Sequence, residues 1–174
     1  MSQRTTKAQM AETIQDMRAW PRREAYVELS AQTRALLEGI DDRVAAMATI
    51  SSLMHGALGY LWTGFYRVAV PDRLLRVGPY QGSIGCLEIT FGKGVCGTAA
   101  AERRTVIVDD VLTFEGHITC DPRSRSEIVV PVFGPSRELI AVFDVDSAER
   151  AAFTDEDRDG MEQILSWFQN AGQR

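Results

Sequence analysis

Few cysteines, few histidines and no long apolar run occur in this chain, and each scarcity excludes a class of protein. Its 174 residues include three cysteines and two histidines. An odd cysteine count argues against a fully paired extracellular disulfide framework. Residues 1–11 are polar and lack the apolar centre of a secretory signal, and no run is long enough to cross a membrane. We therefore expect a cytoplasmic protein with no membrane partner.

The chain has no excess of positive charge, and this bears on possible partners. The formal net charge is −5, whereas binding to a phosphate backbone requires a basic face. Nucleic acid is therefore not an expected partner. His55 and His117 are far apart, and no two cysteines show the two-to-four-residue spacing of common zinc motifs. The spacing predicts no metal site, and we expect no other cofactor.

The hydrophobic pattern predicts an α+β fold. Apolar spacing indicates helices over residues 6–18 and 26–37, and a third that Asp41 or Asp42 caps. Thr154 and Asp157 form the capping-box start of a last helix. Strands and a short helix after the third strand fill the middle. The strands are predicted at residues 60–70, 74–79, 86–89, 105–109, 127–133 and 139–145.

This order of elements predicts how the chain is organised. Helices, then strands, then a helix indicate a largely antiparallel sheet with helices packed on one face. The length fits one domain, which we place at residues 23–174. Residues 1–22 are expected to form an N-terminal helical arm.

Two cysteines lie in segments that favour reactivity. Cys96 follows glycines in a loop that enters a helix, and a helix N-terminus attracts anions and favours a thiolate. The loop lacks the full phosphate-binding pattern because Lys93 is not followed by Ser or Thr. Cys120 comes three residues after His117, which could raise its thiolate fraction. The alternatives are a tight turn with a buried cysteine and a histidine on a surface loop.

Carboxylates and aromatic residues form two further candidate groups. Glu127 opens a strand, and Asp144 and Asp146 are two residues apart, on one face of another. Burial and mutual repulsion would keep one carboxyl protonated near neutral pH, as a general acid needs. Trp62 and Tyr66 share a strand face that suits a methyl or thioether group. The alternatives are a solvated strand face and ordinary core packing.

Four segments together resemble the free methionine-(R)-sulfoxide reductases, which are stand-alone GAF domains. The segments are residues 92–97, 116–121, 124–131 and 143–147. All three cysteines fall in the family's pattern, although Thr119 replaces a more usual small apolar residue. The resemblance implies a six-stranded antiparallel sheet with helices behind it and loops closing a small pocket in front.

The resemblance also implies a reaction. Free methionine sulfoxide would be the substrate, and Cys120 would attack its sulfur and become a sulfenic acid. Cys86 or Cys96 would then form an intramolecular disulfide with it, with Cys86 preferred. A thioredoxin-like reductant would restore the thiols. The implied biological setting is the oxidative stress response.

Substrate-binding roles follow from the same resemblance. The carboxylates of Glu127, Asp144 and Asp146 would hold the amino group and the sulfoxide oxygen. Trp62 and Tyr66 would enclose the methyl group. Backbone amides near Ile118, Thr119 and Cys120 would bind the carboxylate.

Other readings remain open at this point. A GAF domain without catalytic activity could sense a small ligand or a redox change. A ligand sensor does not need the cysteine set, which favours the enzyme. Members of the family often form dimers, so a homodimer is a possible assembly.

Overall fold

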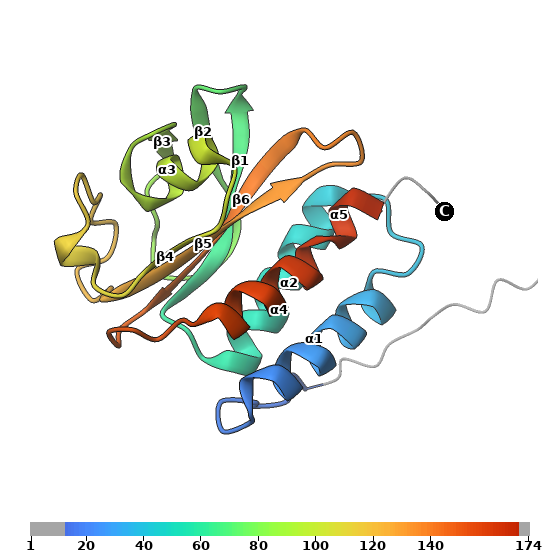
Figure 1. The fold of residues 1–174 in the computed structure, drawn as a ribbon. Coiled ribbons are helices and arrows are strands. Elements are labelled where there is room, and N and C mark those ends of the chain that lie inside the picture. The colour runs from blue at the N-terminus through green and yellow to red at the C-terminus, as the bar shows by residue number, and fades with distance from the viewer. Residues whose placement is uncertain (1–12, 171–174) are drawn as a thin grey trace, which may run out of the picture.

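Six antiparallel strands form the centre of the fold, in the spatial order β3-β2-β1-β6-β5-β4. The computed structural model describes residues 13–170. Its sheet confirms the predicted fold class (Figure 1). The strands are β1 Trp62–Val70, β2 Leu74–Gly82, β3 Glu88–Thr90, β4 Val106–Val108, β5 Ser126–Phe133 and β6 Leu139–Ser147.

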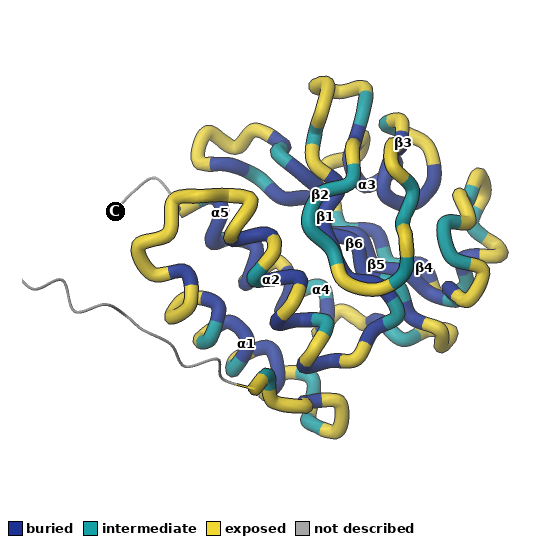
Figure 2. Tube along the Cα trace, turned by 180° about the vertical axis from the view of Figure 1, so that it is seen from behind, coloured by how far each residue is buried: buried dark blue, intermediate teal, exposed yellow. Residues whose placement is uncertain are grey.

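Four helices cover one face of this sheet (Figure 1). They are α1 Arg22–Leu36, α2 Arg43–Leu58, α4 Asp155–Leu165 and α5 Trp167–Asn170. Asp42 caps α2 by accepting from the backbone N–H groups of Val44 and Ala45, and Gly59 ends this helix in the left-handed conformation. The buried residues follow the inward sides of the helices (Figure 2). No helix in residues 13–170 is both long and apolar enough to cross a bilayer.

Helix α1 is held against α4 by a buried polar contact. The Tyr26 hydroxyl donates to Asp157 Oδ1 at 2.9 Å, and Arg22 lies 3.7 Å from the same oxygen. The other oxygen of Asp157 accepts from the backbone N–H of Thr154, which confirms the predicted capping box. Gly160 lies directly under the ring of Tyr26. One buried carboxylate therefore serves the start of α4 and the attachment of α1.

A short helix and two loops cover the opposite face. Helix α3, Gly94–Glu102, packs there in a second and smaller apolar cluster with Trp62 and Tyr66 of β1. A 3-10 turn, Val111–Thr113, opens the long loop before β5. The four other helices occupy one face of the sheet, so the face that carries α3 is the one left open for a pocket.

Strand alternation sorts the side chains between the two faces. On β6, Phe143 and Val145 belong to the core under the helices, so Asp144 and Asp146 point to the other side. On β5, Ile128 packs under the helices and Glu127 faces the other way. Glu127 is the register partner of Asp146 on the adjacent strand. Pairing of β5 with β6 therefore brings three carboxyl groups together on the face that α3 partly covers.

The start of the chain differs from the prediction. Residues 13–18 of the predicted helix 6–18 are not helical, and residues 6–12 lie outside the described part. Met17 is fully buried instead, and its backbone N–H donates to Ala57 O at 2.8 Å. Packing against α2 overrides the apolar spacing, which is only a weak local preference. The division into an arm, 1–22, and a domain, 23–174, stays a prediction.

The contact between Gly160 and Tyr26 yields a stability prediction. Alanine usually stabilises a helix interior over glycine by up to about 1 kcal/mol. At Gly160 the added methyl group would overlap the Tyr26 ring, and overpacking costs about 1–3 kcal/mol. We expect Gly160→Ala to lower the free energy of unfolding in urea denaturation by about 1–2 kcal/mol.

Gly56 in α2 provides the matched control. A methyl group there would meet only the side chain of Ile14, whose Cδ1 atom would be 2.9 Å away, and Ile14 lies in a non-helical segment that can shift. Gly56→Ala should therefore leave the free energy of unfolding unchanged or raise it. Equal stabilities for the Gly160→Ala variant and the parent would contradict the described packing.

Candidate active site

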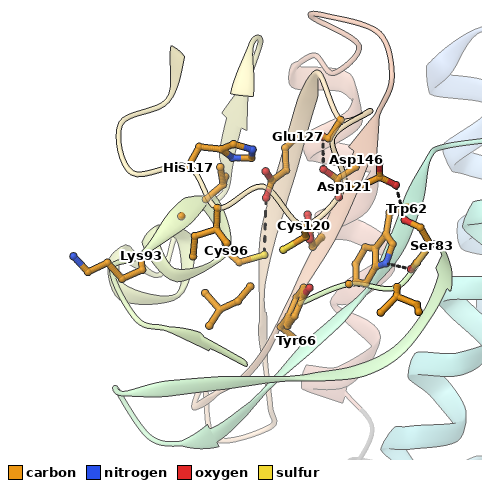
Figure 3. A pocket seen from close by; sticks show the side chains of 18 residues that line it. Trp62, Tyr66, Ser83, Lys93, Cys96, His117, Cys120, Asp121, Glu127 and Asp146 are labelled. Carbon is orange, nitrogen blue, oxygen red and sulfur yellow. Dashed lines mark hydrogen bonds between the residues drawn. The ribbon is translucent and has the colours of Figure 1, made fainter. Parts of the chain in front are cut away.

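A pocket opens on the sheet face opposite the four helices (Figure 3). Strands β1, β5 and β6 form its floor, and α3 and the loops at 83–85 and 117–124 form its walls. Ten residues were predicted as site residues, and all except Cys86 and Thr119 line it. The lining residues are Trp62, Tyr66, Ser83, Ile84, Gly85, Ile89, Lys93, Gly94, Val95, Cys96, His117, Ile118, Cys120, Asp121, Ser124, Glu127, Asp144 and Asp146.

Two of the three cysteines are joined at the pocket wall. Cys86 and Cys120 form a disulfide with their Cα atoms 5.5 Å apart. Cys120 lines the pocket, whereas Cys86 does not. Cys86 precedes β3, which begins at Glu88 and not at residue 86 as predicted. The disulfide therefore ties the loop before β3 to the long loop before β5.

The third cysteine lies in a different environment. Cys96 on α3 is a free, buried thiol, and its Sγ atom is 4.0 Å from Glu127 Oε1. Burial and the neighbouring Asp144 and Glu127 carboxylates raise the pKa of the Cys96 thiol well above its usual value. The expectation that the helix N-terminus favours a thiolate here was wrong, because burial and negative charge outweigh the helix end.

All three carboxyl groups have raised pKa values, those of Glu127 and Asp144 the most. Burial raises the pKa of Glu127 and of Asp144 well above the usual range, and negative charge on the adjacent carboxylates adds to the effect. Burial also raises the pKa of Asp146 to about 6, although a hydrogen bond from Ser124 Oγ opposes the shift. Asp144 Oδ1 is buried and has no hydrogen-bond partner among residues 13–170. The pocket thus holds protons near neutral pH and offers a free acceptor.

An aromatic wall closes one side of the pocket. The rings of Trp62 and Tyr66 stack with centroids 5.5 Å apart. Tyr80 of β2 also stacks on Trp62, with ring centroids 5.2 Å apart. The Trp62 indole N–H donates to the carbonyl oxygen of Ser83 at 3.1 Å. These contacts fix the indole and leave an apolar surface toward the cavity.

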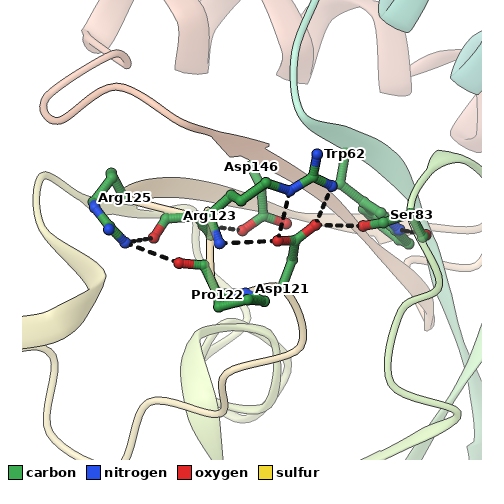
Figure 4. A network of polar contacts seen from close by, with 8 residues as sticks. Trp62, Ser83, Asp121, Pro122, Arg123, Arg125 and Asp146 are labelled. Atoms are coloured by element: carbon green, nitrogen blue, oxygen red, sulfur yellow. Dashed lines mark hydrogen bonds and ion pairs between the residues drawn. The ribbon is translucent and has the colours of Figure 1, made fainter.

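A polar network holds the loops that carry Cys86 and Cys120 (Figure 4). Asp121 accepts from Ser83 Oγ at 2.6 Å, and from the backbone N–H and guanidinium of Arg123. Hydrogen bonds from Arg123 hold the pKa of Asp121 below its usual value. Ser83 and Ser124 were not predicted as site residues, because their partners Asp121 and Asp146 are distant in sequence. Sequence spacing carries no signal for such pairs.

His117 and Thr119 lie differently from what the sequence suggested, which was a histidine on a surface loop and a threonine at the substrate. His117 lines the pocket and is not a fully exposed loop residue. Burial lowers its pKa, and its Nδ1 atom is buried without a hydrogen-bond partner among the described residues. Thr119 is exposed and lies outside the set of lining residues. Ile118, its neighbour, lines the pocket and is partly exposed.

One group of side chains could hold a metal ion. Donor atoms of Cys96, Glu127 and Asp144 all lie within 4.8 Å of one another. Sequence spacing missed this group because α3, β5 and β6 each supply one residue. These three elements are separated in sequence and come together only in the folded chain.

This fold and this pocket define the class of protein. An antiparallel sheet with helices on one face and a loop-covered pocket on the other is the arrangement of a GAF domain. The GAF domain family model matches residues 35–171. That match covers the sheet, α3, α4 and all three cysteines.

Known proteins define the family more closely. The chain is 40% identical to the free methionine-R-sulfoxide reductase of Escherichia coli K12, over 82% of this chain and 86% of that protein. The free methionine-R-sulfoxide reductase of Neisseria meningitidis, solved with its substrate, is 33% identical. Its TM-score is 0.86, with 93% of this chain and 96% of that chain covered. A Burkholderia vietnamiensis protein described as a GAF sensor is 45% identical and has a TM-score of 0.80, with 87% of this chain and 95% of that chain covered. The chain belongs to the GAF-domain family of free methionine-R-sulfoxide reductases.

The raised pKa of Asp146 yields a pH prediction. The folded chain keeps this proton to about pH 6, whereas the unfolded chain releases it near 3.8. Stability of the parent therefore falls as pH rises between these values. Asp146→Asn cannot ionise and still accepts from Ser124. We expect the variant to gain on the parent by up to about 3 kcal/mol between pH 4 and pH 7, measured by urea denaturation of the oxidised protein.

Asp121→Asn is the control of opposite sign. The pKa of Asp121 is lowered in the folded parent, so the ionised carboxylate stabilises the native state at neutral pH. That variant should be less stable than the parent near pH 7, with a difference that shrinks as pH falls through the carboxyl range. A stability difference for Asp146→Asn that is the same at both pH values would contradict the described environment.

Proposed function

We propose that this protein reduces free L-methionine (R)-S-oxide to L-methionine, through a sulfenic acid on Cys120 and a disulfide with Cys86. One observation carries the proposal. The Cys86–Cys120 disulfide lies in the wall of a pocket that contains buried carboxyl groups with raised pKa values. The E. coli and N. meningitidis relatives bear the name of this activity, which supports the same assignment.

The first step transfers oxygen from the substrate to sulfur. The Cys120 thiolate attacks the sulfoxide sulfur, and the oxygen passes to Cys120 as it takes up a proton. Sulfoxide is reduced by two electrons to a thioether, while Cys120 is oxidised to the sulfenic acid. Glu127 supplies the proton, because burial and nearby charge keep its carboxyl group protonated.

The second step forms the disulfide. The Cys86 thiol gives up its proton as its sulfur attacks the sulfur of the Cys120 sulfenic acid, and the hydroxyl group takes up a proton and leaves as water. The pairing of Cys86 with Cys120 agrees with this order. Cys96 instead stays a thiol, 4.0 Å from Glu127 Oε1, where it helps to hold the general acid in place.

The pocket offers complementary groups for each part of methionine sulfoxide. Asp144 and Asp146 accept hydrogen bonds from the ammonium group, and the unpartnered Asp144 Oδ1 is available for this role. Trp62 and Tyr66 enclose the methyl group. The substrate carboxylate binds backbone N–H groups near residues 118–120. A peptide-bound residue lacks both charged ends and would leave these buried groups unpaired, so it is rejected.

Regeneration requires an external dithiol, which we assign to a thioredoxin-like protein. Its thiolate attacks Cys86, because Cys120 faces the pocket and Cys86 lies outside it. Ile84 and Leu87, on either side of Cys86, are 82% and 71% exposed. Exposed apolar side chains of this kind mark contact surfaces for protein partners. The cytoplasmic location expected from the sequence and the homodimer that the family resemblance allows both belong to this proposal.

A purely sensory role explains less of the site. A small-ligand sensor needs a pocket but neither a disulfide in its wall nor buried carboxyl groups that carry protons. A redox switch needs the disulfide but not the aromatic wall beside Asp144 and Asp146. Reductase chemistry uses all three features.

A reduction assay tests the proposed function. The protein is incubated with racemic free methionine sulfoxide and dithiothreitol, and methionine is measured. We expect half of the racemate to be consumed and N-acetylmethionine sulfoxide amide to be untouched. Cys120→Ser should lower turnover by more than about 1,000-fold, because Cys86 lies outside the pocket and the raised pKa of Cys96 keeps that thiol protonated. Absence of methionine production by protein with reduced cysteines would refute the function, and full activity of Cys120→Ser would refute the nucleophile.

Leu87 allows the reductant contact to be tested separately. Leu87→Asp places a charge beside Cys86 without touching the pocket. We expect kcat/KM for thioredoxin to fall about 10-fold, while turnover with dithiothreitol stays at the parent value. Val27→Asp is the matched control, because Val27 is 61% exposed on α1, in the helical layer behind the sheet. Equal thioredoxin rates for Leu87→Asp and Val27→Asp would argue against a contact at Leu87.

A further inference from the structure

Three potential metal ligands converge at the floor of the pocket. Cys96 comes from α3, Glu127 from β5 and Asp144 from β6, and all three are more than nine-tenths buried. One donor atom from each lies within 4.8 Å of the other two. In Figure 3 the Cys96 sulfur and the Glu127 carboxyl group point toward each other. The fold therefore gathers one sulfur and two oxygen donors around a common point.

Two buried atoms of residues that line this pocket lack a partner. Asp144 Oδ1 and His117 Nδ1 form no hydrogen bond within the described part of the chain, and both residues line the pocket. An unsatisfied buried polar atom costs about 1–3 kcal/mol. Burial lowers the pKa of His117, so its neutral ring has one nitrogen with a free lone pair. The free Asp144 Oδ1 atom can therefore accept a cation.

We propose that Cys96, Glu127 and Asp144 bind a zinc ion in the substrate-free protein, and that this ion and the substrate exclude one another. Binding releases the Cys96 proton and the protons of the two carboxyl groups to solvent, and involves no change of oxidation state. The bound ion is held by one thiolate and two carboxylates.

Bond lengths are compatible with this site. Zn–S bonds of about 2.3 Å and Zn–O bonds of about 2.1 Å place tetrahedral ligand atoms roughly 3.4–3.6 Å apart. The Cys96–Glu127 pair, at 4.0 Å, is already close to this value. The widest pair must close by no more than about 1.4 Å, which side-chain rotation can supply. Water completes the fourth position.

Ligand type selects the class of metal. Sulfur and a coordination number of four favour zinc or cobalt over magnesium and calcium, which prefer six or more oxygen ligands. Charge favours the same outcome. Lys93 is the one Lys or Arg among the lining residues, and its amino group points away from the cluster (Figure 3). A divalent cation would supply the positive charge that the cluster of acids lacks.

Mutual exclusion rests on the proposed function, whereas metal binding does not. In that proposal Asp144 accepts from the substrate ammonium group and Glu127 protonates the sulfoxide oxygen. A zinc ion would occupy both carboxylates and remove the proton that Glu127 must donate. The metal-bound protein is therefore inactive, and substrate must displace the zinc ion before it can react.

Cobalt titration of the oxidised protein tests the site directly. With Cys86 and Cys120 in the disulfide, Cys96 is the sole thiol. A thiolate-to-cobalt charge-transfer band can then come only from Cys96. We expect this band, with the visible bands of tetrahedral cobalt, to saturate at about one equivalent and to vanish when zinc is added.

Variants assign the ligands. Cys96→Ser should lose the charge-transfer band, and Asp144→Asn should weaken cobalt binding by at least about 10-fold. Asp121→Asn is the matched control, because Asp121 lines the same pocket but lies outside the cluster. This variant should bind cobalt as tightly as the parent does. If Cys96→Ser fails to fold, Asp144→Asn still decides the outcome.

Several results would overturn the proposal. Cobalt bands without a thiolate component, in protein whose Cys96 is shown to be reduced, would indicate an adventitious ion only. Equal affinity in the parent and in Asp144→Asn would also exclude the site.

Exclusion of substrate is measured separately. Zinc should slow a single turnover of pre-reduced enzyme freed of reductant, and added methionine sulfoxide should relieve the inhibition. Inhibition that substrate does not relieve would refute exclusion. Failure of the reductase assay without metal would refute the proposed function and leave the cobalt result intact.

Discussion

The rest of the site depends on one unfavourable interaction, the burial of Glu127 and Asp144 side by side with no cationic partner among residues 13–170. Sheet pairing enforces it, because β5 and β6 lie next to each other in the centre of the sheet and both acids point to the pocket face. The pocket relieves the repulsion by retaining protons, which raises the pKa of both carboxyl groups. That same proton retention supplies the acid needed to remove a sulfoxide oxygen. Burial of these carboxyl groups therefore lowers the stability of the fold at the same position where the reaction needs a proton donor.

The walls of the pocket are organised differently from its floor. The floor is built from paired strands, whereas the cysteines that exchange electrons lie on loops tied by the disulfide and by the contact between Ser83 and Asp121. Rigid strands keep the carboxyl groups in register, and loops allow thiols to separate and meet again. Cys96 belongs to the floor because it sits on α3 and stays buried. This location separates its role from that of Cys86 and Cys120.

Local patterns predicted most of the fold but only part of the site. Strand-forming residue types and turn signals located all six strands, and the period of two placed Asp144 and Asp146 on one face. Contacts over long sequence distances were not predictable. Met17 is drawn into the core by α2, so the expected first helix is absent over residues 13–18. The high pKa of Cys96 likewise depends on acids from other strands, whereas the sequence showed only a helix N-terminus.

Asp157 has a consequence for where this domain begins. The GAF match starts at residue 35, which would make most of α1 look like an appendage. Yet Tyr26 covers Asp157 and rests on Gly160, so the family-defining part has a cavity shaped for that tyrosine. Trimming the chain to the matched region would expose an apolar groove around a carboxylate. Helix α1 is thus an integral wall of the domain, and boundaries drawn from family resemblance alone would cut through its core.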